Sequence, residues 1–292
     1  MRIKLLLGAS LLFLASCGGN SSRPAESAAP AADTTSAARI VSLSGTTTEI
    51  LCAIGKEKEI VGVDVTSTYP ATVAALPKVG HNRNVSAEAV IALKPQVVVG
   101  IDENIRPELV EQLHSAGIRV MLFHLESSVD GTKALIRTVA DSMGAADKAQ
   151  AICDAIDTDL KDTVSLAKKP KVLFIYARGA GTMMVAGKHT YPNAMIGLAG
   201  AVNAVNDFED FKPLTPESLL KANPDVILMF DSGLESLGGM AGLLEVPGVK
   251  NTNAGKNKKV IEMDGQFLTG FGPRLGKAIA ELSKKLNEVN AH

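Results

Sequence analysis

Three histidines and one aspartate could together be drawn as a site for a metal ion. His81, His124 and His189 are widely spaced along the chain, and Asp264 follows a short apolar run near its C-terminus. Three imidazoles and a carboxylate form a donor set that suits Zn²⁺ or Mn²⁺. Two features oppose a bare-ion site. The chain has no His-rich loop, and Arg83 near His81 would place a second positive charge beside the cation.

Motifs for covalent catalysis are missing from the sequence. It contains no Gly-x-Ser-x-Gly elbow, no Walker loop, no His-Glu-x-x-His and no Cys–His arrangement, so we expect a protein that is not an enzyme. Its 30 Lys and Arg against 31 Asp and Glu give a net charge of −1, which leaves no basic footprint for nucleic acid. A hydrophobic content of 46% also excludes a disordered chain.

The N-terminus reads as a secretion signal with an anchor. Arg2 and Lys4 precede a largely apolar run at 5–14, which is too short to span a bilayer as a helix. The next Leu-Ala-Ser-Cys run, ending at Cys17, resembles the lipobox of bacterial lipoproteins and implies cleavage before Cys17 and acylation of its sulfur. A plain secretory signal with an incidental cysteine is the alternative. Residues 18–38, rich in Gly, Ser, Ala, Thr and Pro, indicate a flexible linker.

Strand and helix patterns alternate twice beyond this linker, which predicts two α/β lobes with parallel sheets at 39–129 and 169–292. Between them, residues 130–168 carry apolar residues at helical spacing and predict one long connecting helix, or a pair broken at Gly144. The predicted strands lie at 39–43, 60–63, 97–101, 118–123, 171–176, 185–186, 226–230 and 259–263. Cys52 lies in the apolar run at 50–54 and Cys153 in a helical pattern, and both are expected to be buried free thiols rather than a disulfide.

An internal repeat places two glutamates at equivalent positions. Residues 86–90 and 215–219 each begin with a hydroxyl residue, have a glutamate two positions later (Glu88 and Glu217), and lead through a proline to a buried strand. One interpretation is a common helix–Pro–strand hinge used twice, because the first turn of a helix favours a carboxylate. The other is a pair of acidic contacts for a partner with two-fold symmetry.

Three further runs carry a resemblance to a known family. They are Leu-Pro-Lys-Val-Gly at 76–80, Lys-Pro-Leu-Thr-Pro-Glu at 212–217 and Gly-Phe-Gly-Pro-Arg at 270–274. Together the runs resemble the periplasmic haem-binding proteins of bacterial haem ABC importers, within the helical-backbone class of solute-binding proteins. The match covers nearly all of residues 39–292. It implies two Rossmann-like lobes with parallel sheets, joined by one long backbone helix, with the ligand in a cleft between the lobes.

The resemblance also implies roles for individual residues. His81 stands where close relatives commonly carry a tyrosine that binds the haem iron, and histidine is itself an ordinary axial ligand. Arg83 would contact a haem propionate, and Arg274 would either do the same or cap its helix region. A second axial ligand would come from the other lobe, although two methionines there equally suit packing. The candidates for this ligand are Met184, Met183, Tyr191 and His189.

The function implied is capture of haem outside the cytoplasm, in the periplasm or at the cell surface, and delivery to an ABC permease dimer with its ATPase. Glu88 and Glu217 would meet that permease, and the chain would act as a lipid-anchored monomer. A bound metal ion, a corrinoid or a ferric siderophore remains an alternative cargo, because fold does not fix the ligand. A structural surface lipoprotein, which binds no small molecule, is the remaining class.

Overall fold

The first lobe is built on a parallel sheet of four strands. A computed structural model describes residues 38–81 and 83–290, so the predicted signal, lipobox and almost all of the linker lie outside the described residues. The strands lie in the order β2-β1-β5-β6, and all neighbouring pairs are parallel, as predicted. Their bounds are β1 (Ile40–Ser42), β2 (Ile60–Val63), β5 (Val97–Ile101) and β6 (Arg119–Phe123).

Short helices connect these strands, and a small hairpin follows β2. Ser44 begins the first helix by accepting a hydrogen bond from the backbone N–H of Thr46, and Ser86 does the same for Ala89. The helices are α1 (Gly45–Ala53), α2 (Ala71–Ala74), α3 (Ala87–Ala92) and α4 (Pro107–Ser115), and the hairpin pairs β3 (Gly80–His81) with β4 (Asn84–Val85). This hairpin was not predicted, because each of its strands has only two residues.

The second lobe has a mixed sheet rather than the expected parallel one. Strands β7, β11 and β12 are parallel, but β8 runs antiparallel to both β7 and β10. Five residues, 178–182, connect β7 to β8, and a parallel crossover needs a dozen or more. The strands are β7 (Lys171–Ala177), β8 (Met183–Ala186), β9 (Val202–Asn203), β10 (Phe211–Pro213), β11 (Val226–Phe230) and β12 (Val260–Met263).

Seven helices surround this sheet in the described part of the chain. They are α7 (Tyr191–Leu198), α8 (Pro216–Ala222), α9 (Asp231–Ser236), α10 (Gly239–Glu245), α11 (Asn253–Lys256), α12 (Gly265–Thr269) and α13 (Leu275–Asn290). Helical patterns in the sequence predict helices at 193–198, 215–221 and 273–289, and the structure has α7, α8 and α13 at these places. The short helices α9 to α12 were not predicted, since four to seven residues carry little helical periodicity.

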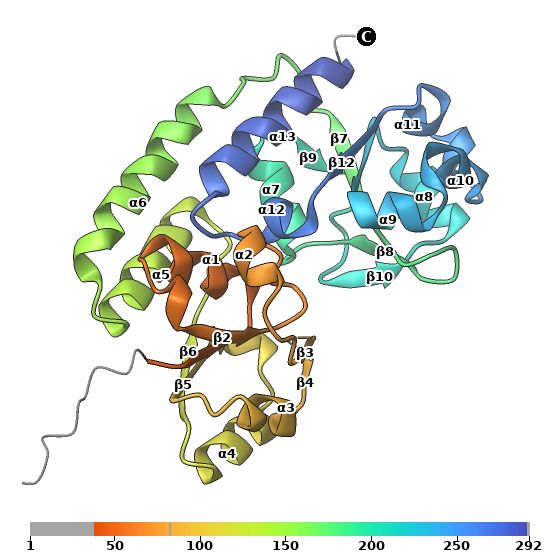
Figure 1. Cartoon of the computed structure of the whole chain (residues 1–292). Coiled ribbons are helices and arrows are strands. Elements are labelled where there is room, and N and C mark those ends of the chain that lie inside the picture. The colour runs from red at the N-terminus through yellow and green to blue at the C-terminus, as the bar shows by residue number, and fades with distance from the viewer. Residues whose placement is uncertain (1–37, 82, 291–292) are drawn as a thin grey trace, which may run out of the picture. The chain divides into compact units, whose positions relative to one another are not determined.

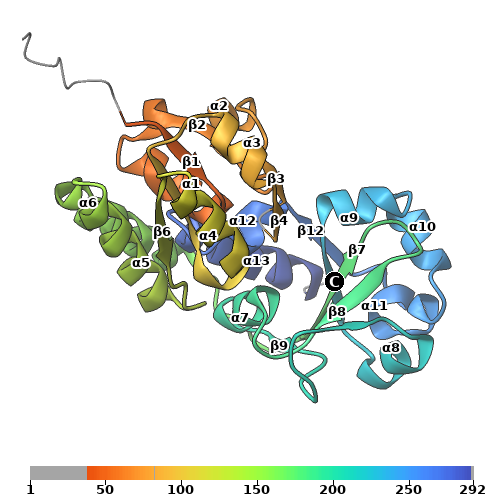
Figure 2. The ribbon, with the colours of Figure 1, turned by 90° about the horizontal axis from the view of Figure 1, so that it is seen from below.

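Two helices, not one uninterrupted helix, connect the lobes. The predicted segment contains α5 (Val129–Ser142) and α6 (Ala146–Asp159), and the break falls at Gly144. Gly144 has φ +67°, a left-handed conformation that ends a helix readily when no Cβ is present. Helix α5 packs against α1 and α6 packs against α13, so the pair contacts both lobes (Figure 1; Figure 2 shows α5 and α6 side by side).

One buried apolar cluster includes side chains from both lobes. It contains Ile50 of α1, Ile136 of α5, Ile156 of α6, Phe174 of β7 and Leu282 of α13. The lobes therefore share a core and are not joined by a linker alone.

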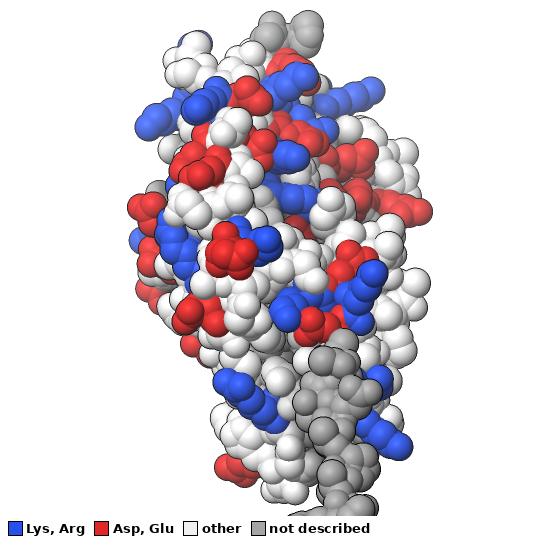
Figure 3. Space-filling model, turned by 60° about the vertical axis from the view of Figure 1, so that its left-hand side comes forward, with Lys and Arg blue, Asp and Glu red and all other residues white. Residues whose placement is uncertain are grey.

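The outer surface around α6 mixes charges of both signs, as Figure 3 shows for the face that includes this helix. Lys133 of α5 forms an ion pair with Asp157 of α6 there. Within residues 38–81 and 83–290, every helix falls short of the length and apolarity needed to cross a membrane. Cys52 and Cys153 are free thiols, as predicted, but only Cys153 is buried and Cys52 is half-buried.

Candidate ligand-binding site

His81 lies on the β3–β4 hairpin, just beyond the carboxyl end of β2. The backbone N–H of Val65 donates to the carbonyl of Gly80, which ties the hairpin to the chain leaving β2. Gly80 has φ +116°, and a Cβ there would lie 2.8 Å from the Asn84 carbonyl oxygen, so the hairpin requires glycine. The His81 side chain is exposed, and its Nδ1 accepts a long hydrogen bond of 3.4 Å from the Arg83 backbone N–H.

Polar residues follow the neighbouring strands at the same edge of the sheet. Asp102 and Glu103 come directly after β5, and His124 comes directly after β6. His124 Nδ1 lies 3.3 Å from Asp102 Oδ2, with both side chains largely exposed. The carboxyl edge of a parallel sheet is where α/β proteins collect ligand contacts. We call this set, with His81 and Arg83, the carboxyl edge of the first sheet.

Tyr191 brings the second lobe to this edge. It is the first residue of α7, and its ring packs against Phe271 at 5.5 Å between centroids. Burial, then the negative charges of Glu103 and Asp102, raise the pKa of the Tyr191 hydroxyl to about 12, while Arg83 opposes the shift. The hydroxyl oxygen is buried and has no hydrogen-bond partner within the described residues. Tyr191 is therefore a neutral phenol, and the nearby Glu103 carboxylate favours this protonated form.

The two candidate methionines point to opposite faces of the second sheet. Met183 pairs with Ala177 and packs into the core beneath α8 and α9, whereas Met184 pairs with Tyr176. Cross-strand partners share a face, so Met184 lies on the side of Tyr176, whose ring meets Phe230 edge-on at 6.2 Å. Both methionines are half-buried, but Met183 packs against the core cluster of this lobe, whereas Met184 lies on the face of Tyr176.

His189 is exposed on the loop before α7, and its backbone has φ +58°. Its Nε2 lies 3.7 Å from a Glu209 carboxylate oxygen, a long contact between two exposed side chains. None of the described contacts connects His189 with His81.

Arg274 is engaged in a contact between the lobes. Its Nε donates to Glu49 Oε2 at 2.9 Å and its Nη2 to the other oxygen of the same carboxylate. The guanidinium also stacks on the ring of Tyr69 at 3.7 Å from the centroid. Burial alone would lower the pKa of Arg274, but the hydrogen bonds and charge of Glu49 together outweigh it and raise the pKa. The main donors of Arg274 are therefore already used.

Gln266 of α12 completes this contact. Its amide nitrogen donates to Glu49 at 2.6 Å, and its oxygen accepts from the backbone N–H groups of Thr68 and Tyr69. Glu49, Gln266 and Tyr69 were not among the predicted site residues. The sequence offered no signal for them, because Glu49 and Arg274 are 225 positions apart.

The two repeat glutamates lie on the outer faces of short helices. Glu88 is exposed on α3, where Ser86 donates a hydrogen bond of 2.7 Å to its carboxylate and lowers its pKa. Glu217 is exposed on α8, which begins at a capping box between Thr215 and Ser218. Both carboxylates are available to a partner.

The alternative of a bare-ion site is not supported by the geometry. Asp264 accepts a hydrogen bond from the Phe267 backbone and caps α12, and His124 and His189 lie beside Asp102 and Glu209. Within residues 38–81 and 83–290, no group of three His, Cys, Asp or Glu side chains is arranged to hold a metal ion.

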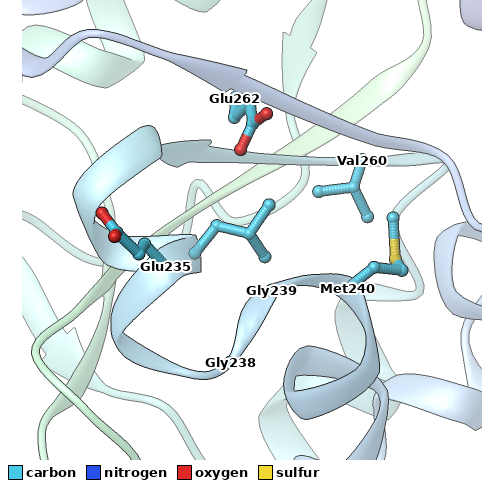
Figure 4. Close-up of a pocket in the computed structure, with 7 residues that line it drawn as sticks. Glu235, Gly238, Gly239, Met240, Val260 and Glu262 are labelled. Atoms are coloured by element: carbon cyan, nitrogen blue, oxygen red, sulfur yellow. The ribbon is translucent and has the colours of Figure 1, made fainter.

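A surface hollow between α9, α10 and β12 contains none of the predicted residues. It is lined by Leu234, Gly238, Gly239, Met240, Val260 and two glutamates, and Figure 4 shows Glu235 at the far end from Met240. This hollow lies on the second lobe alone and offers no contact to the first.

Comparison with known proteins gives a family match over most of the chain. A family described as "Periplasmic binding protein" matches residues 40–267. The substrate-binding lipoprotein YvrC of an ABC transporter in Bacillus subtilis is 32% identical over 256 residues, covering 85% of this chain and 79% of YvrC. A cobalamin-binding protein of Halobacterium salinarum is 26% identical over 270 residues, covering 86% and 70%.

Solved structures match this chain in both sequence and fold. The apo periplasmic heme-binding protein RhuT from Roseiflexus sp. RS-1 is 36% identical with a TM-score of 0.83, covering 87% of this chain and 99% of RhuT. The periplasmic heme-binding protein BhuT, in complex with two hemes, is 36% identical with a TM-score of 0.80, covering 86% and 98%. The two-lobe α/β architecture predicted from the sequence agrees with these structures.

Proposed function

This chain belongs to the periplasmic binding protein family, and from that premise we propose that it captures haem outside the cytoplasm and delivers it to an ABC permease. Two relatives at 36% identity are named as heme-binding, while the cobalamin-binding relative is 26% identical. The observation that carries the proposal is the exposed imidazole of His81 at the carboxyl edge of the first sheet, beside Arg83, whose charge acts on Tyr191 of the second lobe.

His81 is the proposed axial ligand to the haem iron. A neutral imidazole carries one proton, so ligation through Nε2 requires that proton on Nδ1. The ring would then give up the contact from the Arg83 backbone, which is weak at 3.4 Å. Arg83, two residues away, is the proposed partner of a haem propionate.

Met184 is the first candidate for an axial ligand from the second lobe. It shares a face with Tyr176 and Phe230, which would pack against the apolar porphyrin. Tyr191 is the next candidate, although a pKa of about 12 opposes its phenolate in the absence of iron. Met183 and His189 come after these two, because Met183 packs into the core and His189 lies by Glu209. We do not propose Arg274 as a propionate contact, since Glu49 holds it.

A haem titration of the full chain, read by absorbance, tests this proposal. We expect a saturable Soret band that shifts or weakens in His81→Ala, with His114→Ala, at an exposed histidine on α4, as the matched control. A Soret band that His81→Ala leaves unchanged would move the ligand to Met184 or Tyr191. The absence of any Soret band would overturn haem as the cargo.

A corrinoid is the second candidate cargo, because the cobalamin-binding relative spans 86% of this chain. Cyanocobalamin is therefore titrated in parallel. Tight binding of cyanocobalamin with no Soret band for haem would replace haem by a corrinoid on the same fold.

The location rests on the lipobox, and YvrC is itself named a lipoprotein. We propose that Cys17 carries the lipid and becomes the first residue of the mature chain. Mass spectrometry of the N-terminal peptide from membranes of the source bacterium should find a diacylglyceryl group on Cys17. An unmodified N-terminal peptide, or one beginning elsewhere, would contradict the anchor.

A further inference from the structure

The two copies of the internal repeat expose an aliphatic side chain at the same position. Ile91 is 38% exposed on α3, and Leu220 is 45% exposed on α8, 129 residues later. The residues directly before them, Val90 and Leu219, are 0% and 1% exposed and anchor each helix to its lobe. The repeat therefore preserves an outward aliphatic residue as well as the inward one.

Each exposed aliphatic residue lies three positions after a repeat glutamate. Side chains at i and i+3 are neighbours on one helix face, so Glu88 with Ile91, and Glu217 with Leu220, form two similar surface pairs. A single exposed leucine or isoleucine is ordinary and needs no explanation. An equivalent pair in both lobes does need one, because within the described residues six large hydrophobic side chains are exposed and two of them are these.

The surroundings of the first pair are acidic. Ile91 and Glu88 line a shallow hollow between α3 and α4, together with Glu108 and Glu111 of α4. On α8 the nearest basic residue, Lys221, forms an ion pair with Asp207 at 3.3 Å. A partner that complements both pairs presents a basic side chain next to an apolar depression, once for each lobe.

We propose that Ile91 and Leu220 are the apolar anchors through which the two lobes dock onto a membrane partner with two-fold symmetry. Each copy of the partner offers one arginine or lysine to the glutamate and an apolar depression to the aliphatic side chain. The inference rests on the proposed delivery to an ABC permease and adds to it the residues that supply apolar contact area. Charge directs the encounter, and the aliphatic side chains slow dissociation.

The test measures docking without the cargo. The ABC importers of the source bacterium are reconstituted one by one in nanodiscs, and ligand-free full chain is titrated onto each by biolayer interferometry. Ile91→Ser and Leu220→Ser should each weaken binding to the importer that captures wild type by at least about fivefold, mainly through faster dissociation. Val202→Ser, at a valine 42% exposed on β9, is the control and should bind like wild type.

The possible results separate this inference from the cargo proposal. The anchors would be overturned if Ile91→Ser, Leu220→Ser and the double variant all bound like wild type. They would also be overturned if the wild-type chain took up haem but docked on none of the importers. A chain that docks through these residues but shows no Soret band would keep the anchors and reject haem. Ile91→Ala and Leu220→Ala are measured as well, and their thermal unfolding should match that of wild type. A loss of binding in these variants then cannot come from a folding defect.

Discussion

At the scale of single residues, the fold suppresses the chemistry of Cys52. Burial, followed by the negative charges of Glu57 and Glu49, raises the pKa of this thiol to about 12. The thiolate is the reactive form, so alkylation by iodoacetamide at pH 8 should be at least about 100-fold slower than in the urea-unfolded chain. The rate should rise about tenfold per pH unit toward pH 12.

Mass spectrometry of the native and unfolded protein at several pH values gives these rates, with Cys17→Ser removing the third thiol. Because the pKa of Cys52 is higher in the folded chain, its contribution to stability is complete below the ordinary thiol pKa. That contribution is lost as pH rises toward 12. Rapid alkylation of Cys52 in the native protein at pH 8 would contradict this environment.

At this scale the sequence predicts His81 and Arg83 as site residues, because a recognisable run precedes them. The structure places both on one hairpin, and their roles remain predictions. Tyr191 was a candidate, but its position against Glu103 and Arg83 depends on how the lobes meet. Glu49 could not be found, since its partner Arg274 is distant in sequence and a glutamate in a helix is unremarkable.

At the scale of elements, buried strands were predicted best. The strands β2, β5 and β11 have the bounds read from the sequence, because each is a continuous apolar run. Strands β5 and β11 lie in the middle of their sheets, and β2 pairs with β1 at an edge. Strands β9 and β10 were missed, since they have two and three residues and carry polar side chains. The antiparallel β8 was placed in a parallel sheet because periodicity gives no strand direction.

At the scale of the whole molecule, the contact from Glu49 through Arg274 and Gln266 holds the two lobes together. The Glu49 side chain is 4% exposed and that of Arg274 is 20% exposed, so removal of one partner leaves a poorly solvated charge. Arg274→Met should lower the free energy of unfolding by about 3 kcal/mol. Urea denaturation measures this loss, and adding Glu49→Leu to the variant should recover most of it.

A free energy of unfolding for Arg274→Met within about 0.5 kcal/mol of wild type would show that water compensates Glu49 and that the contact contributes little. The matched control is Arg178→Met. The Arg178 guanidinium carbon lies 5.8 Å from the centroid of the Tyr176 ring, and this arginine takes no part in the contact around Glu49.

The shared core has a consequence for how a transporter would sense its cargo. Because one buried cluster passes through α5, α6 and α13 into both lobes, we expect ligand capture to change the angle between the lobes little. Ligand binding would then change the conformation of the surface that docks on a permease very little. Loaded and empty chains would then bind the permease with similar affinity and compete for it. The permease would have to detect the cargo itself at the entrance of its pore, rather than a change in the shape of the binding protein.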